Sequence, residues 1–323
     1  AAVAHAGAHK WSARKVKTDA GRKVRDWIKQ RWYSVIFTTY LKAAETHVVP
    51  ADFILADEAG QATEPTAIVA LAPALHGGHV MLVGDGQQLP PTVRHKGAEW
   101  QGLGTSLLER LQRAHEGMAH SVMLDTQYRM HPDIGDWPAR YFYGGKLSHG
   151  ASGGDRAGYL TPFTLFDVVG ETQQAGGGSW NKVEEKVVIA AIEAVKFVAR
   201  EQLSIGVITF YAKQKQQLAL ALQTARLPQV LVNTVDGFQG GEWRLLEVTH
   251  VLIWPPGERD VIVISCVRAG TPSIGFLQEK ERLNVALTRA RFCLVVIGHM
   301  GTLEKASPDL WGELVTDAKK RDR

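Results

Sequence analysis

Short apolar runs alternate with helix-like stretches along most of this 323-residue chain. The runs that we expect to form buried strands are 34–40, 53–58, 79–85, 121–127, 163–169, 205–211, 229–235, 260–267 and 292–299. Near-continuous apolar strands separated by helices are typical of parallel sheets whose two faces are both covered. The pattern therefore predicts an α/β protein with two domains, each a mostly parallel sheet flanked by helices.

A glycine-rich stretch, HGASGGDRAG at 149–158, is the best candidate for a linker between the domains. We expect a basic helical segment at 1–33, a first domain at 34–150 and a second domain at 151–323. At this length each domain can bury a core of its own. Within the second domain, apolar residues at helical spacing predict a long helix from about Asn181 to Glu201.

Positive charge is concentrated at the start of the chain. Residues 1–42 hold ten Lys and Arg side chains against two Asp, whereas the whole chain has a formal net charge of only +4. Such an asymmetry indicates a polyanion as partner. A solvated basic helix face is the alternative interpretation of the same composition.

Two cysteines, Cys266 and Cys293, each lie inside an apolar run. We expect them to be buried, unpaired thiols of an intracellular protein, cytoplasmic or nuclear, because no disulfide framework or metal-binding spacing is present. No apolar run approaches the length of about 18–20 residues that a membrane span needs. The chain begins with Ala and shows no signal-peptide pattern, so we expect it to be a fragment.

Two adjacent carboxylates, Asp57 and Glu58, follow directly on an apolar run, and no basic residue lies beside them. Parallel strands deliver functional side chains at their carboxyl ends. A carboxylate that holds Mg²⁺ and a second that polarises a water molecule are typical of phosphoryl-transfer sites. Gln88 follows the next strand at a spacing suited to sensing a phosphate. Alternatively, the acids only precede a helix, whose N-terminus also favours negative charge.

Two arginines, Arg289 and Arg291, end the stretch RLNVALTRAR. The apolar pattern predicts that both lie in the last turn of a buried helix, just before a strand. A buried arginine with no carboxylate beside it in the sequence requires an anion, which a phosphate would supply. A structural salt bridge is the alternative for Arg289.

Several motifs occur in a fixed order along the chain: TTY, DEAGQATEP, GDGQQLPPTV, QYRMHP, VITFYAKQ, VDGFQGGE, VISCVR and RLNVALTRAR. From about Ser34 to His299 the chain resembles superfamily 1 helicases of the up-frameshift-like branch, which includes the RNA helicase of nonsense-mediated decay. The resemblance implies two RecA-like domains that close on ATP and Mg²⁺. It also implies stepping along single-stranded nucleic acid, with RNA favoured over DNA.

The resemblance further implies roles for individual residues. Asp57 would hold Mg²⁺ and Glu58 would be the catalytic base. The γ-phosphate would be contacted by Gln88, Arg129 and Arg289, and other parts of the nucleotide by Gly240, Glu242 and Arg291. The nucleic-acid path would include Thr38, Thr39, Pro90, Pro91, Thr234 and Gln239.

The chain departs from the family pattern at two places. The phosphate loop, Gly-x-x-x-x-Gly-Lys-Ser/Thr, does not occur: the only Gly-Lys is followed by Leu147. Because the family has this loop upstream of TTY, we expect the chain to begin after it. In addition, sixteen residues, 243–258, separate VDGFQGGE from RDVIVISCVR, and Gly-Glu appears at both junctions. We interpret them as an insertion, either a genuine loop or translated intron.

The sequence therefore leaves two functions open. One is an ATP-dependent helicase or translocase core, and the other is a catalytically impaired nucleic-acid-binding or regulatory module. Other classes are disfavoured, since the chain lacks the His-Glu-x-x-His spacing of metalloproteases, and its Gly-x-Ser-x-Gly match at 150–154 lies in the glycine-rich stretch and not between a predicted strand and a helix.

The missing phosphate loop leads to a first prediction. The chain on its own should hydrolyse ATP poorly or not at all, because no amide cradle and lysine are present to hold the phosphates. We expect the purified chain to turn over ATP no faster than its Glu58→Gln variant. Turnover clearly above that of the variant would show that a phosphate loop of another sequence operates here.

Overall fold

The computed structural model describes residues 35–43, 50–74, 77–114, 121–150, 159–199, 202–239 and 257–323. The predicted basic segment at 1–33, most of the predicted linker and most of the predicted insertion lie outside these ranges. The chain divides into two compact units, Ala1–Val122 and Met123–Arg323, which we call the N-terminal and C-terminal units. Residues 123–150 thus belong to the C-terminal unit, although their motif places them with the first domain.

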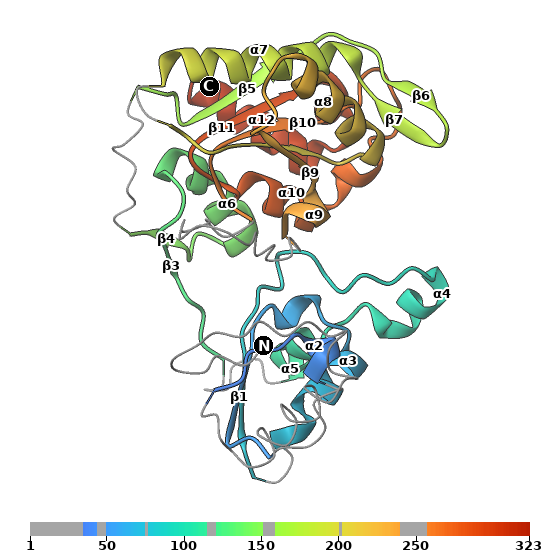
Figure 1. The fold of residues 1–323 in the computed structure, drawn as a ribbon, viewed down its shortest axis with the longest axis vertical. Coiled ribbons are helices and arrows are strands. Elements are labelled where there is room, and N and C mark those ends of the chain that lie inside the picture. The colour runs from blue at the N-terminus through green and yellow to red at the C-terminus, as the bar shows by residue number, and fades with distance from the viewer. Residues whose placement is uncertain are drawn as a thin grey trace. The chain divides into compact units, whose positions relative to one another are not determined.

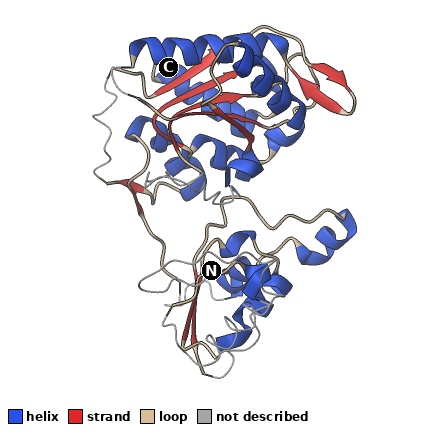
Figure 2. Ribbon diagram, in the orientation of Figure 1, coloured by secondary structure: helices blue, strands red, loops and turns tan. Residues whose placement is uncertain are grey.

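A five-stranded parallel sheet forms the centre of the C-terminal unit (Figures 1 and 2). Its strands, in spatial order, are β5 (Phe163–Asp167), β11 (Ala290–Gly298), β10 (Arg259–Ser265), β8 (Ile205–Thr209) and β9 (Leu231–Thr234). All four pairings are parallel. The five strands predicted in the second half of the chain are therefore confirmed.

Helices cover this sheet on both faces. Consecutive residues of β10 point to opposite faces, and Val261 to Ser265 are all buried, so neither face is open to solvent. One face packs on α7 (Lys182–Val198) and α8 (Ala212–Thr224), whose apolar residues form one core with β8, β10 and β11. The long helix predicted near Asn181 is confirmed as α7.

Further elements complete the C-terminal unit. Its other helices are α6 (Pro132–Tyr143), α9 (Val235–Gln239), α10 (Lys280–Leu287), α11 (Met300–Ala306) and α12 (Glu313–Lys320). Its short strands are β3 (Thr126–Gln127), β4 (Ser148–His149), β6 (Gln173–Ala175) and β7 (Gly178–Trp180), where β6 and β7 form an antiparallel hairpin. Helix α6 contacts β11, and α12 contacts β5.

The described part of the N-terminal unit contains a two-stranded parallel sheet. Strands β1 (Phe53–Ala56) and β2 (His79–Leu82) pair in register from Phe53 opposite His79. Its helices are α2 (Tyr40–Ala43), α3 (Glu64–Leu71), α4 (Lys96–Ala98) and α5 (Leu107–Ala114). The apolar side chains of Phe53, Leu55 and Met81 are more than half exposed, so these strands are not buried on both faces as predicted.

Two of the predicted strands are wrong in this structure. Residues 35–39 of the first apolar run belong to no named strand, and in the run 121–127 only Thr126 and Gln127 form one. Apolar composition favours burial, but a strand also needs a neighbour that accepts and donates its backbone hydrogen bonds. Residues 121–124 are coil with exposed side chains, and the backbone pairing that includes β3 begins only at Asp125, whose carbonyl accepts from Ser148 N–H (2.6 Å).

Both cysteines are buried and free, as predicted, and burial raises the pKa of each thiol. Among the described residues, no helix combines the length and the apolar composition that crossing a membrane would take.

A carboxyl group lies fully buried where α7 meets the carboxyl end of β10. Glu184 Oε2 accepts hydrogen bonds from Ser265 Oγ (2.7 Å) and from the backbone N–H of Val267 (2.8 Å). Asn181, the N-cap of α7, donates from Nδ2 to Glu184 Oε1 (3.3 Å). Burial raises the pKa of Glu184 to about 7, while the hydrogen bonds that it accepts oppose this rise.

This buried carboxyl predicts a pH dependence of stability. Between about pH 4.5 and 7 the folded state keeps a proton that the unfolded state has lost, so stability should fall as the pH rises through this window. The expected loss is on the order of 3 kcal/mol, and the free energy should level off above the folded pKa. The Glu184→Gln variant should lack this component. Urea denaturation of both proteins from pH 5 to 8 measures it, and parallel curves would contradict the prediction.

Candidate functional site

The predicted carboxylate pair lies in a tight turn directly after β1. Asp57 and Glu58 are both exposed, and the Glu58 backbone adopts the left-handed conformation with φ 54°. The turn is held by a hydrogen bond from Glu58 N–H to Asp57 Oδ1 (3.0 Å). Gln61 Nε2 donates to Glu58 Oε2 (2.7 Å), so each carboxylate has one oxygen in a local hydrogen bond. A left-handed residue of this kind is uncommon outside glycine and is concentrated at functional sites.

Glycines bring the ends of β1 and β2 close together. Ala59 N–H donates to Val83 O (2.8 Å), which continues the pairing beyond the strands. A Cβ built on Gly84 would lie 2.8 Å from the backbone nitrogen of Gly60, a distance that no side chain tolerates. Glycine at position 84 therefore allows the Asp57–Glu58 turn to pack against the loop that carries Gln88.

Asp85 organises the loop that holds Gln88. Its Oδ1 accepts from Gln87 N–H (2.8 Å), and its Oδ2 accepts from Gln88 Nε2 (2.9 Å). Gln88 is thus positioned by a carboxylate that lies three residues earlier in the chain. The sequence analysis did not single out Asp85 for a role, although an Asp two or three residues before polar loop residues is a recognised turn signal.

Tyr40 is a second residue that the sequence analysis missed. The side chain of this first residue of α2 donates its O–H to the backbone oxygen of Asp57 (3.1 Å). Burial, followed by the charges of Asp57 and Glu58, raises the pKa of Tyr40 to about 12. The phenol therefore stays protonated and ties the TTY motif to the carboxylate pair. The predicted residues Thr38 and Thr39 precede it and are exposed.

Two predicted arginines come together in the C-terminal unit. Arg129 Nη1 donates to Thr288 O (3.0 Å), and Thr288 directly precedes Arg289 in the chain. Arg129 Nη2 lies 2.5 Å from Glu258 Oε1, and a Cβ built on the adjacent Gly257 would lie 3.4 Å from Arg289 Nη1. We call Arg129, Glu258 and Arg289 the arginine cluster. The sequence analysis assigned no role to Glu258.

Arg289 is buried, as predicted, but its place in the secondary structure differs from the prediction. Helix α10 ends at Leu287 and β11 begins at Ala290, so Arg289 lies in the connection and Arg291 lies within the strand. Thr288 caps the end of the helix, where its backbone N–H (3.1 Å) and its hydroxyl (2.8 Å) both donate to Asn284 O. Arg289 Nε donates back to Val285 O (3.1 Å), which directs the guanidinium along the helix.

The backbone before Arg129 is folded by the side chain of Gln127. Its Oε1 accepts from the N–H groups of Arg129 (2.9 Å) and Met130 (2.8 Å), and its Nε2 donates to Met130 O (2.9 Å). Next along the chain, His131 N–H donates to Arg291 O (2.8 Å). The QYRMHP motif is therefore fastened to the strand that follows Arg289.

The remaining predicted residues fall into three groups. Arg291 Nη1 lies 3.4 Å from Asp260 Oδ1, an ion pair that accounts for its charge within the protein. Thr234 ends β9 and Gln239 ends α9, and both are half-buried, while Pro90 is exposed and Pro91 is buried. Gly240 and Glu242 lie outside the described residues.

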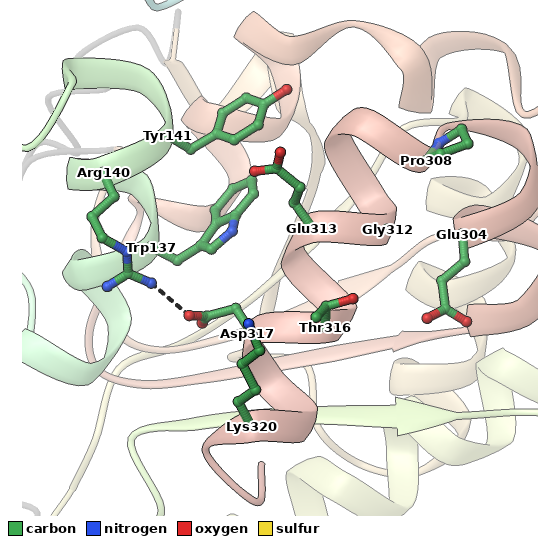
Figure 3. Close-up of a pocket in the computed structure, with 10 residues that line it drawn as sticks. All are labelled: Trp137, Arg140, Tyr141, Glu304, Pro308, Gly312, Glu313, Thr316, Asp317 and Lys320. Atoms are coloured by element: carbon green, nitrogen blue, oxygen red, sulfur yellow. Dashed lines mark hydrogen bonds and ion pairs between the residues drawn. The ribbon is translucent and has the colours of Figure 1, made fainter.

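A pocket of about 530 Å³ lies elsewhere in the C-terminal unit, between α6 and the region of α11 and α12 (Figure 3). The rings of Trp137 and Tyr141 stack in it, with centroids 4.7 Å apart, and Arg140 pairs with Asp317 across it. None of the predicted site residues lines this pocket. The motifs and the pocket are therefore separate features of this unit.

The arginine cluster predicts an energetic coupling between Arg129 and Glu258. Their side chains are only 32% and 23% exposed, so solvent screens the ion pair less than it would at the surface. In a double-mutant cycle of Arg129→Gln and Glu258→Gln, we expect a coupling of about 1 kcal/mol in the free energy of unfolding. Chemical denaturation of the four proteins measures it. The surface pair Arg113–Glu109 serves as a control that should show less, and equal couplings would contradict the prediction.

Comparison with known proteins places these features in a family. Two family models, both described as AAA domain, match residues 6–96 and residues 103–252 with 256–301. Solved structures with a similar fold include a helicase described as "The structure of PRRSV helicase" (TM-score 0.42, 15% identity), which matches 79% of this chain and 37% of its own.

Similar proteins are helicases of much greater length. Helicase sen1 of Schizosaccharomyces pombe is 35% identical over 289 residues, which are 83% of this chain and 16% of that protein. Probable helicase senataxin of Homo sapiens is 33% identical, over 84% of this chain and 10% of that protein. The regulator of nonsense transcripts 1 homolog of Drosophila melanogaster is 35% identical, over 83% and 22%. The chain therefore belongs to the AAA-domain helicases of the up-frameshift-like branch of superfamily 1.

Proposed function

We propose that this chain carries the core residues of an ATP-dependent helicase that moves on single-stranded nucleic acid. The observation that supports this proposal most strongly is the arginine cluster. Two arginines that lie far apart in the sequence are brought to one backbone segment, Gly257–Glu258. Arginines that stabilise the charge on a transferred phosphoryl group are a recurring part of nucleotide-hydrolysing sites, and the cluster supplies two of them.

The carboxylate pair of the N-terminal unit suits a magnesium nucleotide. The donor set consists of the exposed carboxylate oxygens of Asp57 and Glu58, which are hard ligands of the kind that Mg²⁺ prefers. No group of three or more His, Cys, Asp or Glu side chains that could hold a metal occurs among the described residues. One or two carboxylates are nevertheless sufficient for Mg²⁺ when substrate phosphates and water complete its shell. Bound Mg²⁺ would neutralise charge on the phosphates.

In this proposal the chain's own residues divide the work. Asp57 would hold the metal, and Glu58 would accept a hydrogen bond from the attacking water and orient it. Tyr40 and Gln61 keep the two carboxylates in place through the contacts that they already make. Asp85 holds Gln88 so that its side chain can respond to the γ-phosphate from the neighbouring strand.

The arginines act on the phosphate charge that develops during transfer. Arg129 Nε is buried and has no hydrogen-bond partner in the part of the chain that the structure describes, so this guanidinium is not fully satisfied. An incoming phosphate oxygen supplies the missing acceptor and competes with Glu258 for the guanidinium. Arg289, held to α10 by its Nε contact, provides the second positive charge.

A second function stays open for this polypeptide, namely a nucleic-acid-binding or regulatory module with impaired catalysis. The sequence contains no Gly-Lys-Ser/Thr of a phosphate loop, which favours this alternative for the chain by itself. We infer RNA rather than DNA as the preferred strand, in an intracellular setting. The two functions differ in one property: in a helicase the nucleotide changes the affinity for nucleic acid, whereas in a non-catalytic binding module it does not.

The test is therefore a linkage measurement. We expect the full chain to bind a fluorescent single-stranded RNA, and Mg·ATP to change that affinity by about 5-fold or more, the usual size of coupling between two sites. The Arg289→Lys variant should bind RNA normally but lose most of the nucleotide effect, because an ammonium cannot reproduce the fork of a guanidinium.

The matched control is Arg140→Lys, which makes the same change at the ion pair with Asp317, where no predicted site residue takes part. It should keep the nucleotide effect. RNA binding that ignores Mg·ATP would favour the non-catalytic module, and a chain that binds no RNA under low salt would contradict both functions.

A further inference from the structure

Four side chains lie in contact one after another beside the five-stranded sheet, with the two central rings tilted by 49° to one another. The guanidinium of Arg268 lies 4.9 Å from the ring centroid of Tyr211, and that ring lies 6.0 Å from the ring of Phe276. The guanidinium of Arg282 lies 4.8 Å from the centroid of Phe276. Arg268 Nε also donates to Tyr211 Oη (2.9 Å). We call Tyr211, Arg268, Phe276 and Arg282 the aromatic–arginine array.

Phe276 is placed outward by its local backbone. It lies in a short 3₁₀ turn, Gly275–Gln278. Ile274 just before the turn and Leu277 within it are fully buried, whereas Phe276 is 50% exposed. Gly275 begins the turn in the left-handed conformation with φ +55°, which a residue with a side chain adopts only under strain. A phenylalanine that served only the core would point inward with its neighbours, and a large exposed ring beside two arginines indicates a contact surface.

A strained turn delivers Arg268 to the array. Val267 has φ +73°, and Arg268 N–H donates to Cys266 O (2.8 Å), the geometry of the rare γ-turn. This conformation is held from both sides, because Val267 N–H donates to Glu184 Oε2 and Val267 O accepts from Asn181 Nδ2 and Thr172 Oγ1. Strain that the surrounding structure fixes so fully is concentrated at binding and catalytic sites.

The array lies at the edge of the sheet where ligands bind in parallel α/β folds. Tyr211 follows β8 and Arg268 follows β10, and these strands are neighbours, so both side chains come from the carboxyl ends of the sheet. Arg282 Nε donates to Asp236 Oδ1 (3.0 Å) on α9, within the VDGFQGGE motif. Arg282 is also paired with Glu279, so its positive charge is already compensated. Its planar guanidinium supports the ring of Phe276.

We propose that Phe276, backed by Arg282 and Tyr211, is a stacking platform for one base of a single-stranded nucleic acid. This inference rests on the proposed function and adds a base contact to a path otherwise expected to follow the backbone. Base stacking on an aromatic ring is tolerant of sequence and is a common device in proteins that bind single strands. Lys213 and Lys215, on the first turn of α8 directly after Tyr211, supply positive charge for the adjoining phosphates.

The experiment compares Phe276→Ala with Phe197→Ala in the full chain. Phe197, on the last turn of α7, is 92% exposed and lies outside the array, so it controls for loss of a surface phenylalanine. We expect Phe276→Ala to weaken binding of a single-stranded oligouridine by about 5- to 150-fold, which is the loss of affinity expected when one base no longer stacks. Phe197→Ala should leave the affinity unchanged, and Phe276→Trp should preserve it.

Two further readouts separate stacking from other causes. The dependence of affinity on salt should be the same in the wild type and in Phe276→Ala, since no phosphate contact is removed. On an abasic strand with the same backbone, the difference between the two proteins should disappear. A thermal unfolding temperature unchanged by the substitution excludes loss of folding as the cause.

The outcomes distinguish this inference from the function on which it rests. If the wild type binds the RNA and Phe276→Ala binds it equally well, the platform is wrong and the proposed function stands. A loss that persists on the abasic strand also overturns the platform, because it would show a backbone contact. If the wild type binds no RNA, both proposals fall together.

Discussion

One buried polar network fixes the carboxyl edge of the five-stranded sheet. Glu184 on α7 reaches across to Ser265 and to the backbone of Val267, while Gln214 on α8 donates to the same Ser265 hydroxyl (3.0 Å). A buried carboxyl is tolerated only when its hydrogen bonds are satisfied, so two helices and one strand must meet at this point in one arrangement. The strained turn after β10, and the direction in which Arg268 leaves it, follow from that requirement.

Sequence periodicity predicted the C-terminal unit well because there burial and pairing coincide. Strands β8, β10 and β11 are buried along nearly their whole length, and all five main strands have at least one parallel neighbour within the described chain. The two conditions separate at the boundary between the units. The run 121–127 contains three consecutive apolar residues, Val122 to Leu124, yet Val122 and Leu124 are more than 80% exposed. Side-chain composition carries no information on whether a partner strand is present, and the prediction failed for that reason.

The candidate site shows a similar division between local and distant information. Asp57, Glu58, Arg129 and Arg289 could be identified because each belongs to a short motif. Their supports could not, since Tyr40 reaches Asp57 across 17 residues and Arg129 reaches Thr288 across 159. Such pairs depend on how the elements pack, which no spacing rule encodes. Asp85 is the exception, because its contact with Gln88 spans three residues and its turn chemistry was readable.

Two Gly-Glu dipeptides lie at the two ends of the interrupted VDGFQGGE–RDVIVISCVR motif. Either Gly241–Glu242 or Gly257–Glu258 could complete the motif that continues into RDVIVISCVR. Glu258 directly precedes β10, and its carboxylate pairs with Arg129. Gly257 allows the chain to pass close to Arg289 at the same point. The second dipeptide therefore places a carboxylate on Arg129 and a glycine beside Arg289 directly before the strand.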